Sequence, residues 1–196
     1  MEYATYGKKE LLREEVETLK ELEEQLGEPL YRREERFGGV QKDSLKYYFS
    51  AEDGKVVRLN LGGWDVCDVT LVGHLKHLKN LGLAETDVSD LSPLKNLEEL
   101  RELNIRETKV SDLTHLRGLM ELKRLQLWDT DVSDVSPLRD LKGLEELTIK
   151  ETKVSDLSPL EGLENLESVG VDYHIIGKNE DLLEKLKERG VNVWRA

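Results

Sequence analysis

Two histidines three residues apart, His74 and His77, are the first residues in this 196-residue chain whose spacing could support chemistry. On one face of a helix, such a pair can supply two ligands to a metal ion. A metal site needs further ligands, and neither His115 nor His174 stands at a spacing that completes the set. We therefore predict that the two histidines lie on the surface and that the protein binds no metal.

Other residue types that catalyse reactions are present without a recognisable arrangement. The sequence has no glycine-rich phosphate loop and no G-x-S-x-G nucleophile turn. Its single cysteine, Cys67, would need a neighbouring base to act as a nucleophile, so we predict a small buried residue instead. The 41 acidic residues count as surface charge unless a pocket pairs two of them. We predict a protein that is not an enzyme, with no catalytic residues and no cofactor.

One seven-residue stretch occurs four times, and the rest of the chain is organised around it. It has the form Glu/Asp-Thr-Asp/Lys-Val-Ser-Asp-Leu/Val and occupies residues 85–91, 107–113, 129–135 and 151–157. The period is 22 residues without a slip. Self-similarity at a fixed period of this size is the signature of a solenoid, in which stacked repeats share one core.

The full unit reads L-x-x-L-x-L/I-x-x-T-x-V-S-D-L-S-P-L-x-x-L-x-x. It resembles the leucine-rich repeat, whose core is L-x-x-L-x-L. The length and the V-S-D-L-S-P-L return resemble the internalin-type class, a unit also seen in protein phosphatase regulatory subunits. This family often has asparagine where the present chain has threonine. Because a threonine hydroxyl can still bond to nearby backbone, we expect the internal ladder of hydrogen bonds to survive in altered form.

Each part of the unit has a physical interpretation. The alternation in Leu103-Asn104-Ile105 predicts a half-buried strand, and the strands of successive repeats would lie parallel, about 4.8 Å apart. Asp112 suits capping of the turn that follows, and Pro93 and its equivalents sit early in that turn. The resemblance implies an α/β leucine-rich-repeat solenoid, a right-handed curved superhelix with a parallel sheet on its concave face and short helical or 3-10 returns on its convex face.

Three regions follow from these patterns. Residues 1–55 are predicted to form an N-terminal cap with a helix over 8–26 and a β-hairpin arm around 52–54. Residues 56–176 hold about five repeats and a partial one. Residues 177–196 are predicted to form a C-terminal cap, in which Asn179 begins a helix and Trp194 helps to cover the last repeat. The apolar stripe of the first helix covers the open end of the solenoid in our interpretation, although it could also bind a partner helix.

Charge and cysteine content restrict the partners. A net charge of −12 argues against nucleic acid or an anionic membrane as partner and favours a basic protein. One cysteine forms no internal disulfide, which suits a reducing compartment. The first residues lack a basic region followed by an apolar run, so we expect no signal peptide, a cytoplasmic location and a monomer.

The outward positions of the short strands contain the candidate binding site. The resemblance to the leucine-rich repeat implies that these positions line the concave face, where partners bind. Trp128 stands where other repeats have small or charged residues, and an exposed tryptophan is a typical binding hot spot. We predict a protein-binding patch centred on Trp128, and its other members are Arg106, Arg124, Lys150, Asn104, Gln126, Glu102 and Glu146. The alternative is that the neighbouring cations only stack on the indole.

A column of carboxylates follows the strands and comprises Glu85, Glu107, Asp129 and Glu151. It could form an acidic rim for a basic partner or a cation. The column two positions on alternates in sign, so we favour a solvated edge whose ion pairs compensate one another and contribute under about 1 kcal/mol each.

These observations favour a non-enzymatic protein–protein interaction module that binds a partner on its concave face. Two alternatives stay open. The chain could be a regulatory subunit of an enzyme such as a phosphatase, as the resemblance allows. It could also be a structural or designed repeat scaffold without a dedicated ligand.

Overall fold

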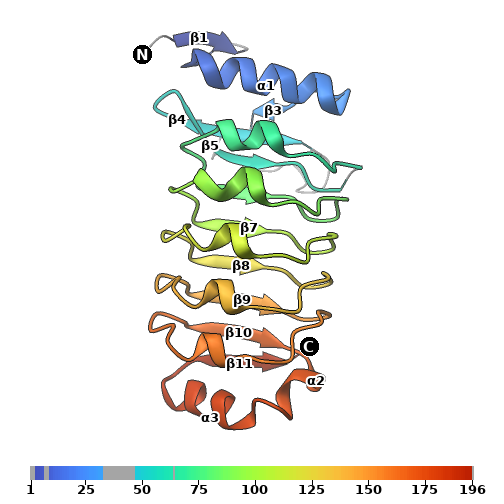
Figure 1. Ribbon diagram of the computed structural model, residues 1–196. Helices are drawn as coiled ribbons and strands as arrows, with labels where there is room; N and C mark the ends of the chain where they lie inside the picture. The colour runs from blue at the N-terminus through green and yellow to red at the C-terminus, as the bar shows by residue number, and fades with distance from the viewer. Residues whose placement is uncertain (1–2, 7–8, 33–46, 64, 196) are drawn as a thin grey trace, which may run out of the picture.

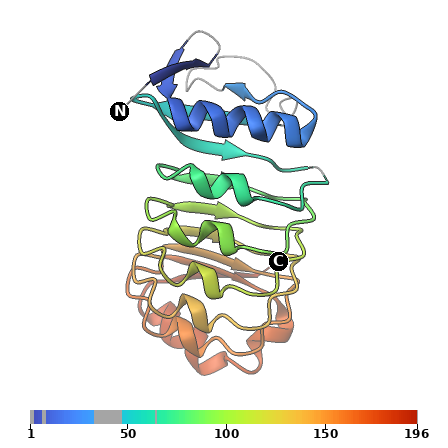
Figure 2. The same ribbon diagram turned by 45° about the horizontal axis from the view of Figure 1, so that its top comes forward.

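The computed structural model describes residues 3–6, 9–32, 47–63 and 65–195. Among these residues, nine strands form one sheet in the order β11-β10-β9-β8-β7-β6-β5-β4-β3. The sheet makes one side of a solenoid, and short 3-10 helices make the other side (Figure 1). The turned view shows the same two layers with the strands behind the returns (Figure 2). The predicted leucine-rich-repeat architecture is confirmed.

The strands of the repeats are parallel and keep the 22-residue register. Their bounds are β5 Lys55–Asn60, β6 Asn80–Gly82, β7 Glu102–Asn104, β8 Arg124–Gln126, β9 Glu146–Ile149 and β10 Ser168–Val171. Leu59 pairs with Leu81, and each following strand pairs with a residue 22 positions later. We call one strand with its flanking residues a rung. Each sequence column therefore runs straight across the rungs.

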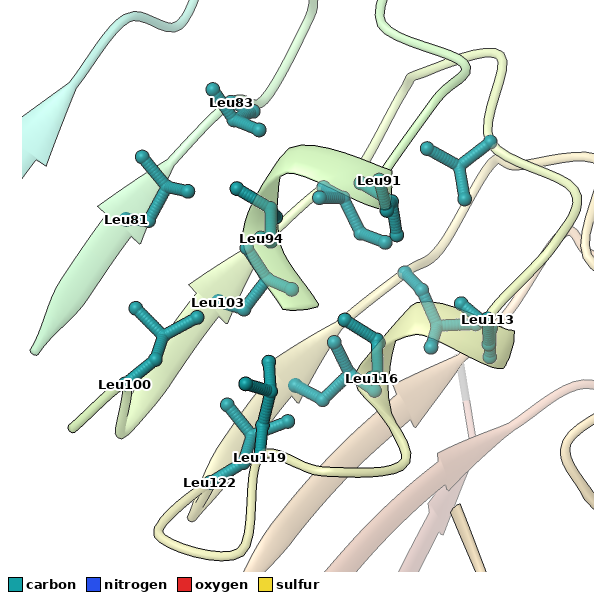
Figure 3. Close-up of a cluster of buried hydrophobic side chains, with 14 of the residues drawn as sticks. Leu81, Leu83, Leu91, Leu94, Leu100, Leu103, Leu113, Leu116, Leu119 and Leu122 are labelled. Carbon is teal, nitrogen blue, oxygen red and sulfur yellow. The ribbon is translucent and has the colours of Figure 1, made fainter. Parts of the chain in front are cut away.

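The returns on the opposite side are 3-10 helices, as predicted. Their bounds are η1 Thr70–His74, η2 Ser92–Asn96, η3 Thr114–Leu116, η4 Ser136–Leu138 and η5 Ser158–Leu160. The three proline-containing returns place Pro93, Pro137 and Pro159 in the first turn, where a missing N–H leaves no bond unmade. Leucines from strands and returns meet between the two layers and are almost wholly buried (Figure 3). Each such side chain contributes about 1.5–3 kcal/mol to stability.

An aspartate starts each return by accepting a backbone N–H, which confirms the role predicted for Asp112. Its carboxylate accepts the N–H of Thr114 at 2.8 Å, and Asp90 and Asp134 accept the equivalent N–H of a serine at 2.7 Å. The serine or threonine at the start of each return donates its backbone N–H and its side-chain hydroxyl to the aspartate. These hydrogen bonds favour the ionised carboxylate and hold the pKa of Asp90, Asp112 and Asp134 below the ordinary value.

The repeated threonines close the turn of their own rung. Thr86, Thr108 and Thr130 are buried, and each hydroxyl donates to the carbonyl three residues earlier at 2.7 Å. Neighbouring rungs are joined at this edge by backbone instead, as in the bond from Lys109 N–H to the Val88 carbonyl at 3.0 Å. The hydrogen bonds of the threonines thus run within repeats and not from one repeat to the next.

The N-terminal region differs from the prediction in its first turn. Residues Lys9–Leu12 form strand β2, which pairs antiparallel with β1 (Tyr3–Tyr6), and helix α1 spans Arg13–Leu26. The N–H of Leu12 donates to the Gly54 carbonyl at 2.8 Å, which ties β2 to the following hairpin and stops the helix from starting earlier. Val16, Leu19 and Leu22 of α1 are buried in the same core as the repeats.

The hairpin arm consists of β4 (Tyr48–Glu52) and β5, which pair antiparallel around a turn at Asp53 and Gly54. Strand β3 (Tyr31–Arg32) lies parallel to β4 at the edge of the sheet. Cys67 is exposed, so the prediction of a buried cysteine is wrong. Its loop lies between β5 and η1, and the core positions there belong to Val66 and Val69.

The C-terminal region contains α2 (Tyr173–Ile176), α3 (Glu180–Glu188) and β11 (Asn192–Arg195). Asn179 is the N-cap residue of α3, so the helix begins where predicted, but its side chain makes no capping bond. Its amide is buried and bonds elsewhere. Oδ1 accepts the N–H of Leu157 at 2.9 Å, and Nδ2 donates to the carbonyls of Ser155 and Ile175 at 3.0 and 2.7 Å. One side chain thus satisfies three backbone groups at the end of the repeats.

Candidate interaction surface on the sheet

Three columns of side chains emerge from the outer, concave face of the sheet. The first contains Glu102, Arg124 and Glu146. The second lies two residues further along each strand and contains Asn104 and Gln126. The third follows the strands and contains Arg106, Trp128 and Lys150. Backbone hydrogen bonds extend the ladder to this column, since Glu107 N–H donates to the Trp128 carbonyl at 3.0 Å and Asp129 N–H to the Lys150 carbonyl at 2.9 Å. All eight predicted patch residues therefore lie on one face.

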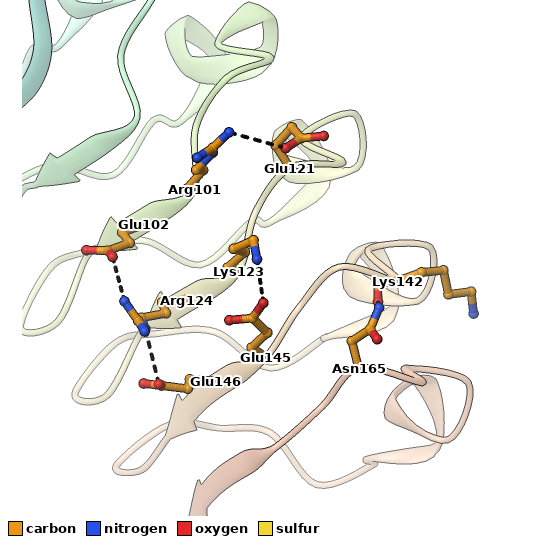
Figure 4. Close-up of polar contacts among 9 residues, drawn as sticks. All are labelled: Arg101, Glu102, Glu121, Lys123, Arg124, Lys142, Glu145, Glu146 and Asn165. Atoms are coloured by element: carbon orange, nitrogen blue, oxygen red, sulfur yellow. Dashed lines mark hydrogen bonds and ion pairs between the residues drawn. The ribbon is translucent and has the colours of Figure 1, made fainter. Parts of the chain in front are cut away.

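Arg124 belongs to an ion-pair triad within the first column (Figure 4). Its Nη1 is 2.7 Å from Oε1 of Glu102, and its Nε is 3.1 Å from Oε1 of Glu146. These two carboxylates raise the pKa of Arg124 above its ordinary value. The contacts hold the guanidinium over its own column, so Arg124 does not join Trp128 in the way the sequence predicted. The triad orders three long side chains in the middle of the face.

Arg106 lies against Trp128. Its guanidinium carbon is 5.4 Å from the centre of the indole ring, within reach of a cation–π contact. Its Nη2 also donates to Oε1 of Glu85 at 2.7 Å. Its Nε is buried and has no hydrogen-bond partner among the described residues. The stacking alternative raised from the sequence thus describes Arg106, and Trp128 is half-buried beneath it.

A second indole lies on the same face, and the sequence did not predict it. Trp194 of β11 is 36% exposed and lies across Gly170, where an added Cβ would come 2.6 Å from the ring. Its Nε1 donates to Oγ of Ser168 at 3.0 Å. The ammonium of Lys150 is 4.0 Å from the ring centre, so this cation covers Trp194 and not Trp128. The signal in the sequence was the glycine at position 170, which leaves space in an outward column for a large side chain from the next strand.

A hollow of about 610 Å³ opens over the N-terminal half of this face, above β4 to β8. Four residues of the predicted patch line it, namely Glu102, Asn104, Arg124 and Gln126. Trp128, Arg106, Lys150 and Glu146 are not among its lining residues. The predicted single patch therefore divides into a polar hollow and a separate pair of tryptophans with their cations.

The predicted acidic rim follows the third column. Glu85, Glu107, Asp129 and Glu151 all have left-handed backbone, with φ of 60°, 52°, 53° and 49°. Glu85 is paired with Arg106, whereas the other three carboxylates have no ion-pair partner within the described ranges. The next column compensates itself, because Lys109 and Lys153 lie 2.7 and 2.6 Å from Asp87 and Asp131. Sequence reasoning did not foresee the positive φ, which is uncommon outside glycine.

The two histidines have different surroundings. His74 is exposed, and Nδ1 of His77 lies 2.8 Å from Oε1 of Glu99. In the part of the chain that the structure describes, no three His, Cys, Asp or Glu residues are grouped so that they could hold a metal ion. No described helix has both the length and the apolar character needed to span a membrane.

Comparison with known proteins identifies the architecture. No protein-family model and no curated protein matches the sequence. The structure is similar to internalin C2 from Listeria monocytogenes, with a TM-score of 0.60 and 29% identity over 65% of this chain and 59% of that chain. Another internalin of the same organism aligns with a TM-score of 0.55 and 28% identity over 65% of this chain and 35% of that chain. A leucine-rich-repeat protein from Leptospira interrogans aligns with a TM-score of 0.64 and 25% identity over 70% of this chain and 36% of that chain.

The parallel rungs, the 3-10 returns and these similarities define a leucine-rich-repeat protein. Within that class the repeats are internalin-like, as the 22-residue unit predicted. The aligned region spans less than two thirds of each of the three proteins. Their similarity therefore describes this chain's fold and repeat type.

Proposed function

We propose that the chain is a non-enzymatic protein–protein interaction module that binds a partner protein on its concave face. The observation that carries the proposal is the pair of indoles on that face, each in contact with a cation. Arg106 lies 5.4 Å from the ring centre of Trp128, and Lys150 lies 4.0 Å from that of Trp194. Tryptophan and arginine are the residues most enriched in binding hot spots.

The two tryptophans are candidate anchors for different physical reasons. Trp194 is 36% exposed, so a partner that covers it gains apolar burial. Trp128 is already half-buried, and a partner would complete the cover while keeping its contact with Arg106. Lys150 makes no ion pair with any described residue, so a carboxylate of the partner can bind it beside the indole.

We propose further that basic residues of the partner face the rim carboxylates Glu107, Asp129 and Glu151. The net charge of −12 supports this orientation, because long-range attraction speeds the encounter with a basic surface. The chain is proposed to act as a cytoplasmic monomer.

The test is a pull-down from lysate of source cells with four versions of the chain side by side. These are the unchanged chain, Trp128→Ala, Trp194→Ala and Met120→Ala. Met120 is 55% exposed in the turn after η3 and serves as the matched control for loss of an exposed apolar side chain. The protein captured by the unchanged chain is then purified for affinity measurement.

We expect both tryptophan variants to weaken binding about 30-fold, which corresponds to about 2 kcal/mol for a hot-spot residue. Met120→Ala should leave the dissociation constant unchanged. Equal capture by all four versions would refute the indole anchors. Melting temperatures of the variants would show that any loss does not come from unfolding.

A further inference from the structure

The hollow over β4 to β8 has a lining that the proposed tryptophan anchors do not use. Its outward side chains are carboxamides, guanidinium groups, a carboxylate and hydroxyl groups, contributed by Tyr48, Ser50, Arg58, Asn60, Asn80, Glu102, Asn104, Arg124 and Gln126. The lining leucines on β5, β6 and β7 are at most 2% exposed, so they present backbone to the hollow and direct their side chains into the core. The hollow therefore offers hydrogen bonds and almost no apolar side-chain surface.

The depth of the hollow comes from small residues on β6. This rung carries Asn80 and Gly82, whereas β7 and β8 carry longer side chains in the same two columns. A Cβ at Gly82 would come 2.2 Å from Oδ1 of Asn60, so the neighbouring amide lies over the glycine. Gly82 and the Asn60 amide above it thus form the floor together, and the larger residues of β8 form one wall.

Several hydrogen-bonding groups in the hollow have no partner among the residues that the structure describes. The side chains of Asn80 and Gln126 make no hydrogen bond to any described residue. Asn104 uses Oδ1 to accept the N–H of Arg106 at 3.2 Å, which leaves its NH₂ group available. These three amides lie on the successive rungs β6, β7 and β8, about 4.8 Å apart per rung, and Asn80 is one column away from the other two. The Arg124 wall is held in place and electrically balanced by Glu102 and Glu146.

We propose that this hollow binds a neutral oligosaccharide. A carboxamide presents a donor and an acceptor side by side, and adjacent sugar hydroxyls match it because each of them both donates and accepts. Sugar rings in a linear chain repeat at close to the spacing of the rungs, so successive rings can meet successive amides. Tyr48 lines one end of the hollow and would bring an aromatic side chain beside the sugar there.

Two other ligand types fit the lining less well. An extended peptide gains affinity from its main chain but needs recesses for alternate side chains, and the hollow has no apolar recess for them. An acidic ligand would have to compete with Glu102 and Glu146 for Arg124, which already binds both carboxylates. Arg58, the other guanidinium of the lining, also has an interaction within the protein. A ligand rich in hydroxyl groups and without charge satisfies the amides and leaves the triad intact.

The test starts with the unchanged chain on an array of neutral oligosaccharides, followed by affinity measurement with the retained sugar by titration NMR. Asn104→Leu and Gln126→Leu keep the approximate shape and remove the hydrogen bonds, and we expect each to weaken binding about tenfold. Gly82→Leu should abolish binding, because the new side chain fills the floor and displaces the Asn60 amide that lies over the glycine. Thr148→Val, in the same column but outside the hollow, should change affinity by less than about twofold.

The oligosaccharide site and the protein-binding role of the two tryptophans can fail independently, and the experiments distinguish the two failures. No retained oligosaccharide, or a retained one that ignores Asn104→Leu and Gln126→Leu, would overturn the carbohydrate site. The same chain is also panned against a phage-displayed peptide library. Peptides whose binding requires Asn104 and Gln126 would assign the hollow to polypeptide and likewise overturn the proposal. Trp128→Ala should leave sugar binding unchanged, and its effect on the protein partner tests only the interaction module.

Discussion

Replacement of Asn179 by leucine should destabilise the protein more than any exposed polar substitution. The asparagine is 7% exposed, and its amide satisfies three backbone groups in and beside the last repeat, at distances between 2.7 and 3.0 Å. Leucine has a similar size but neither accepts nor donates. A buried backbone group without a partner costs about 1–3 kcal/mol, so three such groups cost about 3 kcal/mol at the low end. This is a large fraction of a typical domain stability of about 5–15 kcal/mol.

The assay is urea unfolding followed by circular dichroism, with Asn165→Ala as the matched control. Asn165 is an exposed asparagine that donates one hydrogen bond to the Lys142 carbonyl at 2.8 Å, and its loss should cost less than about 1 kcal/mol. Hydrogen exchange adds a local measurement, because the N–H of Leu157 loses its acceptor in Asn179→Leu and should exchange faster. A cost below about 1 kcal/mol with unchanged exchange at Leu157 would refute the reasoning.

Three further predictions concern other parts of the chain. Burial raises the pKa of Glu15 above its ordinary 4.5, so ionisation opposes folding as the pH rises through the folded-state pKa. Glu15→Gln, which can still accept the Val56 N–H, should therefore be more stable than the unchanged chain at pH 7, and this gain in stability should shrink below pH about 4.5. Thermal melts at pH 7 and below pH about 4.5 check this, and an equal gain in stability at both would contradict it. Glu107→Gly should raise the free energy of unfolding by up to about 1 kcal/mol, since φ is 52° there, and a lower urea midpoint would count against backbone strain. Cys67 should react fully with Ellman's reagent in the native state, and a requirement for denaturant would show that the thiol is buried.

The 22-residue period made the architecture predictable because every rung has the same residue types at the positions that determine its strand and its return. Leu103 and its equivalents point inward, Asp112 begins the return, and Pro137 sits in its first turn, so each unit supports the same conclusion. Errors concentrate where the period ends. The start of α1 at Arg13 depends on the bond from Leu12 N–H to the carbonyl of Gly54, a residue far along the chain, which no local pattern encodes.

The candidate site was harder to predict for a related reason. The outward columns were correctly aligned, but alignment does not reveal which neighbour a long side chain approaches. Arg124 binds the carboxylates of its own column, and Lys150 reaches Trp194, a residue that the sequence assigned to covering the last repeat. The hollow depends on the small side chains of β6 relative to those of the next rungs, and that contrast of sizes becomes visible only once the sheet is assembled.

The unbroken register of the rungs also makes the molecule adjustable in length. Because β8 and β9 pair through residues 22 positions apart, a duplicated unit inserted between them would reproduce the same ladder on both sides. Each such insertion would move Trp194 about 4.8 Å further from the hollow and from Trp128. The distance between Trp194 and the hollow is thus set by a whole number of rungs. Gain or loss of repeats, in evolution or by protein engineering, would change this distance in equal steps.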